Sequence, residues 1–191
     1  SVSLKAVNSI QIYALGMVDN PGGYKISSVA KGINAVIAGG GFHENASLRS
    51  IEIKRKDEVI KVIDLYDFLI FGNTSSDIRL KNGDVVFVGG MNSSVSIYGG
   101  VNAPHIFEIK PGDTISDILK FAQGFSVDAD RSKIKVSRKN QHGQYEVLTT
   151  DNFEMEVQHS DILEVDVLKD EKDWGHKKIL NLGKKKKFKK N

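Results

Sequence analysis

Apolar side chains alternate with polar ones in several short runs, and the same succession of runs occurs twice along the chain. Alternation of this kind has the period of a strand that buries one face. The second succession follows the first at a constant offset of 83 residues, which relates Gly16 to Gly99, Pro21 to Pro104 and Ile26 to Ile109. A repeat of this length predicts two copies of one small structural unit.

A β-hairpin is expected to open the first copy. The alternating run 10–14 predicts one strand, and Tyr24–Ile26 predicts the strand that returns beside it. Between them, Asp19–Gly23 combines Asp, Asn, Pro and two Gly, which is typical of a turn.

A short helix is expected to follow the hairpin. Four apolar residues recur at helical spacing and would form its buried face: Val29, Ile33, Val36 and Ile37. Ser27 or Ser28 is expected to cap the helix, and the triplet Gly39–Gly41 to end it.

The rest of the first copy predicts three strands and one further turn or two of helix. Alternation places the strands at 51–53, 59–62 and 85–88. The helical turn lies between the last two, where Leu65, Phe68 and Leu69 have helical spacing. The resulting order, β-β-α-β-β-α-β, defines a small mixed α+β unit.

The second copy repeats this order with clearer helix signals. Thr114 and Asp117 fit a capping box, directly after a turn at Lys110–Asp113. The helix buries a stripe formed by Ile115, Ile118, Leu119 and Ala122, and strands are expected at 134–136, 145–148 and 160–165. This copy is about six residues shorter around 64–77, a segment that we interpret as peripheral to the shared fold.

The repeat predicts two domains, residues 8–90 and 94–168, joined by the linker Met91–Ser94 and followed by a basic tail at 169–191. A hydrophobic fraction of 40% with 27% charged residues is typical of a soluble globular protein. No apolar run approaches the roughly 20 residues that a membrane helix requires. Because the chain starts at Ser1 without a leader, we expect it to be cut from a longer protein.

The net charge of +3 is unevenly distributed. Residues 1–176 contain 19 basic and 24 acidic side chains, a net charge of −5, and eight lysines follow. A mildly acidic body argues against nucleic acid as a partner, since phosphates require a basic face. The lysine run 184–190 would suit an anionic surface, but a solvated and self-repelling end is the preferred interpretation.

Three segments together resemble tandem SLBB domains, the soluble-ligand-binding β-grasp modules of bacterial polysaccharide export proteins. They are Val18–Tyr24, the run from Ile63 to Val88, and Gly100–Pro104 near the beginning of the second copy. The resemblance covers roughly residues 8–168. It implies an α+β fold of two tandem β-grasp-like domains, each a small mixed sheet with one main helix.

The resemblance also implies a role in capsule or exopolysaccharide export, in the periplasm or at the outer membrane. Partners implied in this way are the exported polysaccharide, other subunits of the export machinery in a homo-oligomeric ring, and an inner-membrane co-polymerase. Two departures matter: the export domain and lipidated cysteine that normally precede the first module are not in this chain, and Trp174–Asn191 lacks the apolar stripe of a membrane-spanning amphipathic helix.

Residues that could support catalysis or metal binding form no recognisable set. The chain has no cysteine, which excludes disulfides and thiolate chemistry. Its histidines have no metal-ligand spacing and are interpreted as surface or loop residues: His43, His105, His142, His159 and His176. Gly39–Gly41 ends a helix, so it is not a phosphate loop.

The acidic residues offer no better case for an enzyme. A glycosidase pair could be sought among Asp64, Asp67, Asp77 and Asp84. Asp84 and Asp161, however, occupy equivalent turns in the two copies, which favours a structural role. We therefore predict no enzyme, no cofactor and no metal.

Candidate binding residues lie in the Asn-x-Pro turns of the two copies. Loops on a rigid scaffold commonly carry binding, and aromatic rings suit the C–H faces of sugars. The predicted set for a glycan or a neighbouring subunit is Asn20, Gly22, Tyr24, Asn102, Pro104 and Phe107. Plain turn chemistry is the alternative interpretation of the same residues.

Two functional hypotheses remain at this point. The first is a non-enzymatic binding and assembly module of a polysaccharide export system. The alternative is a β-grasp ligand- or DNA-binding module of an uptake system, which only the lysine-rich tail supports.

Overall fold

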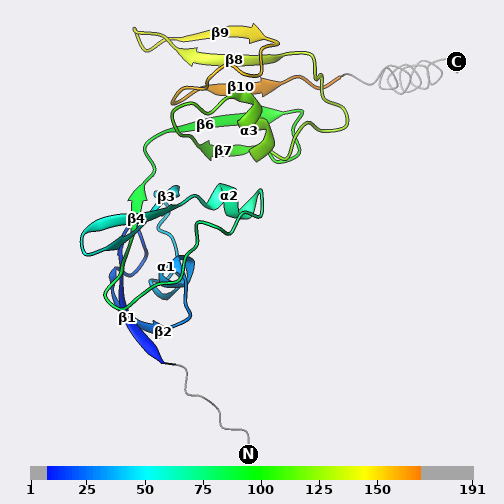
Figure 1. Ribbon diagram of the computed structural model, residues 1–191. Coiled ribbons are helices and arrows are strands. Elements are labelled where there is room, and N and C mark those ends of the chain that lie inside the picture. Colours follow the sequence, from blue (N-terminus) through cyan, green and yellow to red (C-terminus); the bar gives the residue numbers. More distant parts are fainter. Residues whose placement is uncertain (1–7, 169–191) are drawn as a thin grey trace, which may run out of the picture. The chain divides into compact units, whose positions relative to one another are not determined.

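Two five-stranded mixed sheets form the part of the chain that the structure describes, residues 8–168 of a computed structural model (Figure 1). The chain divides into two compact units, and the second sheet lies mostly in the second unit except for the start of β6 and the end of β7. The first unit comprises the described residues up to Val95 together with Phe107–Pro111, and the second comprises Ser96–Ile106 and the described residues from Gly112 onward. The predicted tail, 169–191, lies outside the described residues.

The first sheet has the strand order β2-β1-β5-β3-β4. Its elements in chain order are β1 (Ser9–Gly16), β2 (Gly22–Ser27), α1 (Gly32–Ala38), β3 (Ala46–Arg55), β4 (Glu58–Ile63), α2 (Leu65–Leu69) and β5 (Val85–Gly90). Strands β1 and β5 pair in parallel, and every other neighbouring pair is antiparallel. The predicted order β-β-α-β-β-α-β is confirmed.

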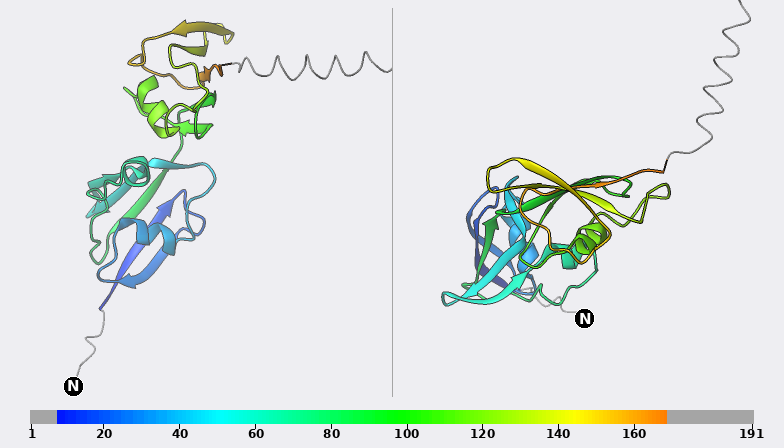
Figure 2. Two further views of the ribbon diagram at one scale, coloured as in Figure 1. Left: turned by 90° about the vertical axis from the view of Figure 1, so that its right-hand side faces the viewer. Right: turned by 90° about the horizontal axis from the view of Figure 1, so that it is seen from above.

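The second sheet repeats this topology as β7-β6-β10-β8-β9. Its elements are β6 (Ser94–Gly99), β7 (His105–Glu108), α3 (Ile115–Phe121), β8 (Ile134–Lys139), β9 (Tyr145–Thr150) and β10 (Ile162–Val165). Strand β10 is parallel to β6, as β5 is to β1. Figure 2 shows both sheets from two further directions. The predicted fold class, two tandem α+β units, is confirmed.

The core of the first unit lies between one face of its sheet and the two helices. Alternate residues of each strand point into it, which is why the pattern of the sequence has a period of two. The buried set includes Ile12, Ala14, Ala35, Val36, Ile51, Ile53, Ile63, Leu65, Val86 and Val88. In the second unit the corresponding residues are Ile97, Ile115, Ile118, Leu119, Ala122, Ile134, Val136, Leu163 and Val165.

The start of α1 differs from the prediction. The helix begins at Gly32 with Lys31 as its N-cap residue, so neither Ser27 nor Ser28 caps it. The backbone amide of Leu80 donates to the carbonyl of Ala30 at 3.0 Å, and this contact holds the preceding segment out of the helix. Val29 therefore lies outside the helix and is more than half exposed. Ile37 lies in the helix but is also more than half exposed, so neither residue belongs to the buried face.

The segment 64–77, which we expected to be peripheral, is partly built into the first unit. Leu65 and Tyr66 of α2 are buried. Asp77 is also buried, and its carboxylate accepts a hydrogen bond from the backbone amide of Ile33 at 3.1 Å. Among the described residues the second unit has no counterpart of α2, so the segment is not part of the shared fold, but within the first unit it is not peripheral.

A repeated glycine ends the first strand of each unit. Gly16 has φ +82° and Gly99 has φ +87°, values that L side chains rarely adopt. A Cβ atom at either position would lie 2.1 Å from a carbonyl oxygen, that of Val88 or that of Val165. This close approach between parallel strands explains why both copies carry glycine here.

Candidate functional site

The first three predicted binding residues lie together at the hairpin turn of the first unit. Asn20 is exposed, Gly22 begins β2, and Tyr24 is half-buried. The Tyr24 hydroxyl donates to the backbone carbonyl oxygen of Asn20. The backbone amide of Asn20 donates to the carbonyl of Gly39 at 2.8 Å. The turn is thus fastened both to β2 and to the end of α1.

Asn102 and Pro104 lie at the equivalent turn of the second unit, and both are exposed. The side-chain nitrogen of Asn102 donates to the carbonyls of Gln123 at 2.8 Å and Phe125 at 3.2 Å. Both hydrogen atoms of this amide therefore go to the loop that follows α3. The side chain of Asn102 has a structural role at this turn.

Phe107 occupies a different environment from its sequence counterpart Tyr24. It is only 8% exposed and belongs to the first unit, where its ring meets the ring of Tyr66 edge-on with 6.1 Å between centroids. The structure therefore brings Asn20, Gly22 and Tyr24 together and does not bring Phe107 to them.

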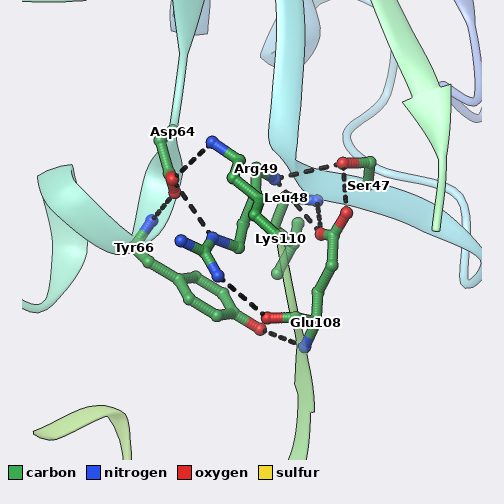
Figure 3. A network of polar contacts seen from close by, with 7 residues as sticks. All are labelled: Ser47, Leu48, Arg49, Asp64, Tyr66, Glu108 and Lys110. Atoms are coloured by element: carbon green, nitrogen blue, oxygen red, sulfur yellow. Dashed lines mark hydrogen bonds and ion pairs between the residues drawn. The ribbon is translucent and has the colours of Figure 1, made fainter. Parts of the chain in front are cut away.

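The residue after Phe107 is the centre of a buried polar network (Figure 3). One carboxylate oxygen of Glu108 accepts from the hydroxyl of Ser47 at 2.6 Å. The other accepts from the backbone amides of Leu48 at 2.8 Å and Arg49 at 3.2 Å. The backbone amide of Glu108 in turn donates to the hydroxyl of Tyr66 at 2.9 Å. All of these contacts lie within the first unit.

Arg49 extends the network towards α2. Its guanidinium donates through Nε to Asp64 at 3.1 Å and through Nη1 to the carbonyl of Glu108 at 3.2 Å. It also lies over the ring of Tyr66, 5.1 Å from the centroid, in a cation–π arrangement. Lys110 adds a second ion pair to Asp64, with a distance of 2.8 Å between Nζ and the carboxylate.

Asp64 is the acidic partner of both cations, and its pKa is lowered. Burial opposes ionisation and is the largest single influence on this carboxyl. The hydrogen bond from Lys110 and the charge of Arg49 together outweigh it, so the folded protein favours the carboxylate. Burial raises the pKa of the Tyr66 phenol, which keeps its proton available.

The network can hold a segment of chain in place. Its polar atoms are used on one another, and across residues 8–168 no buried side-chain nitrogen or oxygen lacks a hydrogen-bond partner. No three His, Asp or Glu side chains within these residues lie close enough to hold a metal ion. His43, His105, His142 and His159 are exposed, and His176 lies outside the described residues.

Comparison with known families gives two matches, one in each copy of the repeat. A family model for the SLBB domain matches residues 11–64 and again residues 94–149. The chain belongs to the SLBB domain family. The first match ends at Asp64, so the segment that contains Tyr66 lies beyond it.

The tandem SLBB chain is also similar to curated relatives. Two proteins of Escherichia coli, each named polysialic acid transport protein KpsD, are 29% identical to it over 123 residues. The alignment covers 63% of this chain and 22% of each relative. The chain therefore spans about a fifth of the length of the curated relatives that it matches. Within the described residues, no helix is both long and apolar enough to span a membrane.

Each SLBB domain contains the same buried aspartate at the turn before its last strand. Asp84 accepts two hydrogen bonds from Arg55, each at 2.8 Å, and Asp161 accepts the two corresponding bonds from Nε and Nη2 of Arg138 at 3.0 and 2.7 Å. Asp84 is fully buried and Asp161 nearly so. Because each carboxylate is enclosed by an arginine and a backbone amide, both aspartates are structural, as the sequence predicted.

Sequence reasoning missed the polar network of the first unit. Its charged members, Arg49, Asp64, Glu108 and Lys110, come from both copies of the repeat. One signal was present in the sequence: the residue that corresponds to Glu108 in the first copy is Lys25, which has the opposite charge. Such a reversal at an otherwise similar position marks a contact that only one copy makes.

Proposed function

We propose that this chain is a non-enzymatic binding and assembly module of a capsule or exopolysaccharide export system. The observation that carries the proposal is the tandem SLBB organisation combined with similarity to polysialic acid transport protein KpsD. The polar network of the first unit is consistent with a non-enzymatic role, because its side chains bind one another and hold the chain together.

The proposal includes a location and partners. The module acts in the periplasm or at the outer membrane. There it meets the other subunits of the export machinery, including an inner-membrane co-polymerase, and contributes to a homo-oligomeric ring. Its contacts with these proteins are the main activity, and contact with the exported glycan is the second.

The glycan contact is proposed for the turn of the first SLBB domain. Asn20 is exposed, and the ring of Tyr24 is half-buried beside it. A rigid turn that combines an amide with an aromatic ring suits the hydroxyls and C–H faces of a sugar. At the second turn Asn102 is used by its own domain, so Pro104 offers the exposed surface there.

A titration of the full chain with an acidic oligosaccharide, such as a short polysialic acid, tests this contact. Backbone amide NMR signals of Asn20, Gly22 and Tyr24 are expected to shift, and Asn20→Ala should reduce the shifts. An exposed asparagine away from the turn, Asn152, provides the matched control as Asn152→Ala. If saturating oligosaccharide leaves all signals in place, the glycan contact is wrong.

A further inference from the structure

The face of the first sheet that points away from α1 carries an unusual number of apolar side chains. We call it the outer face, and it consists of two rows that cross four strands. The first row is Tyr13, Val85, Lys54 and Val59. The second row is Leu15, Phe87, Glu52 and Val62.

The large apolar residues of the outer face are substantially exposed. Tyr13 is 43% exposed, Phe87 37%, Val59 50% and Val62 44%. Leu15 and Val85 are partly exposed between them. Single exposed apolar residues are common, but six on one face of one sheet form a continuous patch of the kind that marks an interaction site.

The second SLBB domain provides an internal comparison, because its sheet has the same topology. Its corresponding rows are Ser96, Ile162, Ser137, Val147 and Tyr98, Glu164, Lys135, Thr149. Polar or charged residues thus replace Tyr13, Phe87 and Val62, at Ser96, Glu164 and Thr149. The second row there is also internally paired, because the Tyr98 hydroxyl donates to Glu164 at 3.2 Å and Lys135 lies 3.7 Å from the same carboxylate.

This comparison separates what the fold requires from what it does not. Both domains bury the same set of inward-facing strand residues, and the second one folds with a largely polar outer face. The apolar side chains of the first outer face are therefore not needed for folding. Their exposure to water costs free energy that contact with a partner would recover.

The charges on the outer face indicate which partner it fits. Lys54 and Glu52 are the only charged residues in the two rows, and their side chains pair at 2.9 Å. The Lys54 ammonium also lies 4.7 Å from the centroid of the Phe87 ring. From β1 across β5 and β3 to β4, each row reads apolar, apolar, charged, apolar. The charged residue is a lysine in the first row and a glutamate in the second.

This pattern is self-complementary. Consider two copies that pack face to face about a two-fold axis lying between the two faces, parallel to the rows and midway between them. The first row of one copy then lies over the second row of the other, with the strands in the same order. Lys54 then meets Glu52 of the second copy, and apolar residues meet apolar residues at the other three places. We propose that the outer face of the first SLBB domain binds the same face of a second copy of this chain. This isologous contact goes beyond the proposed export role.

The size of the outer face sets the expected strength of the contact. Four strands spaced at about 4.8 Å span roughly 15 Å, which is smaller than a standard protein interface. The dimer is therefore weak, and it forms as the local concentration of the chain rises. Because an isologous contact uses the same patch on both copies, it stops at two chains.

Sedimentation velocity of the full chain over a wide concentration range tests the proposal. The wild-type chain is expected to shift from monomer to dimer. Tyr13→Ser and Phe87→Glu introduce the residues that the second domain has at these positions, so the fold should tolerate them, and circular dichroism can verify this. Phe87→Glu should weaken association by about tenfold or more, since it buries a charge in the contact. Ile37→Ser, at a 66% exposed residue of α1, is the matched control and should leave association unchanged.

A charge exchange tests the face-to-face geometry itself. Lys54→Glu and Glu52→Lys each place like charges across the two-fold axis, so each variant alone should stay monomeric. An equimolar mixture should recover a mixed dimer, because every cross-axis pair is then opposite in charge. A wild-type chain that remains monomeric at all concentrations would overturn the proposal. Association that survives Phe87→Glu, or a mixture that gives no dimer, would do the same.

Discussion

The carboxylate of Glu108 accepts a hydrogen bond from the hydroxyl of Ser47 at 2.6 Å, although 61 residues separate them in the sequence. Ser47 is fully buried and Glu108 nearly so. A buried acceptor that serves a hydroxyl and two backbone amides cannot be removed without leaving donors unpaired. This one side chain therefore fastens the segment Phe107–Pro111 inside the first unit.

Replacement of Glu108 by alanine should destabilise the first SLBB domain strongly. The change leaves the Ser47 hydroxyl and the backbone amide of Leu48 without their acceptor, and it removes one of the two acceptors of the Arg49 amide, which keeps the Ser47 hydroxyl oxygen. We expect a loss of about 3 kcal/mol in the free energy of unfolding, measured by urea denaturation at pH 7. Glu154→Ala, at an exposed glutamate of the second domain, is the control. Equal stability of the two variants would contradict this account.

Arg49→Lys should also be destabilising, even though the charge is kept. Lysine cannot donate to Asp64 and to the Glu108 carbonyl in the same fork geometry, and it stacks less well on Tyr66. The expected loss is about 2 kcal/mol by the same denaturation measurement. Arg131→Lys, at an exposed arginine, should change stability by less than about 0.5 kcal/mol. A similar effect at both sites would argue that the network contributes little.

Two glycines with nearly the same φ should respond differently to alanine. Gly99 and Gly112 have φ +87° and +89°, but only at Gly99 would a Cβ lie 2.1 Å from a backbone oxygen, that of Val165. Gly112→Ala should cost about 1 kcal/mol for the left-handed backbone alone. Gly99→Ala should cost about 3 kcal/mol or more, because two parallel strands must separate as well. Thermal unfolding of both variants measures the difference, and equal costs would show that the strands adjust freely.

Stability should fall in acid through Asp84. Burial opposes the ionisation of this carboxyl, but hydrogen bonds from Arg55 and from the amide of Lys81 outweigh it and lower its pKa. The folded pKa thus lies below the unfolded value of about 3.9. The stabilisation is present above about pH 4 and is lost as the pH falls through the folded pKa.

Urea denaturation from pH 7 to about pH 2.5 can isolate this contribution. Asp84→Asn should be less stable than the wild type at pH 7, and its stability should depend less on pH in the acid range. Because Asp64 also has a lowered pKa, some pH dependence should remain in the variant. A variant whose acid profile matches the wild type would exclude Asp84 as a source.

Helices α3 and α1 illustrate how much of the fold the sequence predicts. For α3 the capping box is local: Thr114 and Asp117 bond each other, and the predicted stripe is buried. For α1 the start depends on Asp77 and Leu80, which bind Ile33 and Ala30 from more than 40 residues away. Local patterns cannot reveal a helix start that distant backbone contacts determine.

The candidate site likewise has a part that the sequence predicts and a part that it does not. The turn around Asn20 was predictable because its residues are consecutive and have strong turn preferences. The pairing of Ser47 with Glu108 was not, because 61 residues separate them and no local pattern indicates which distant residue either one contacts. The alignment of Tyr24 with Phe107 led to a wrong prediction that both rings lie at binding turns. Tyr24 does lie beside the turn of the first unit, but Phe107 is buried in that unit.

The inclusion of Phe107–Pro111 in the first unit has a practical consequence for how this protein can be divided. A gene fragment that ends at Gly90 encodes one whole repeat, yet in its product Ser47 would lack the carboxylate to which it donates, and the Tyr66 hydroxyl would lack the backbone amide from which it accepts. The repeat is the unit in which the sequence was duplicated. A fragment that keeps the contacts of Ser47 and Tyr66 must therefore include Glu108 as well.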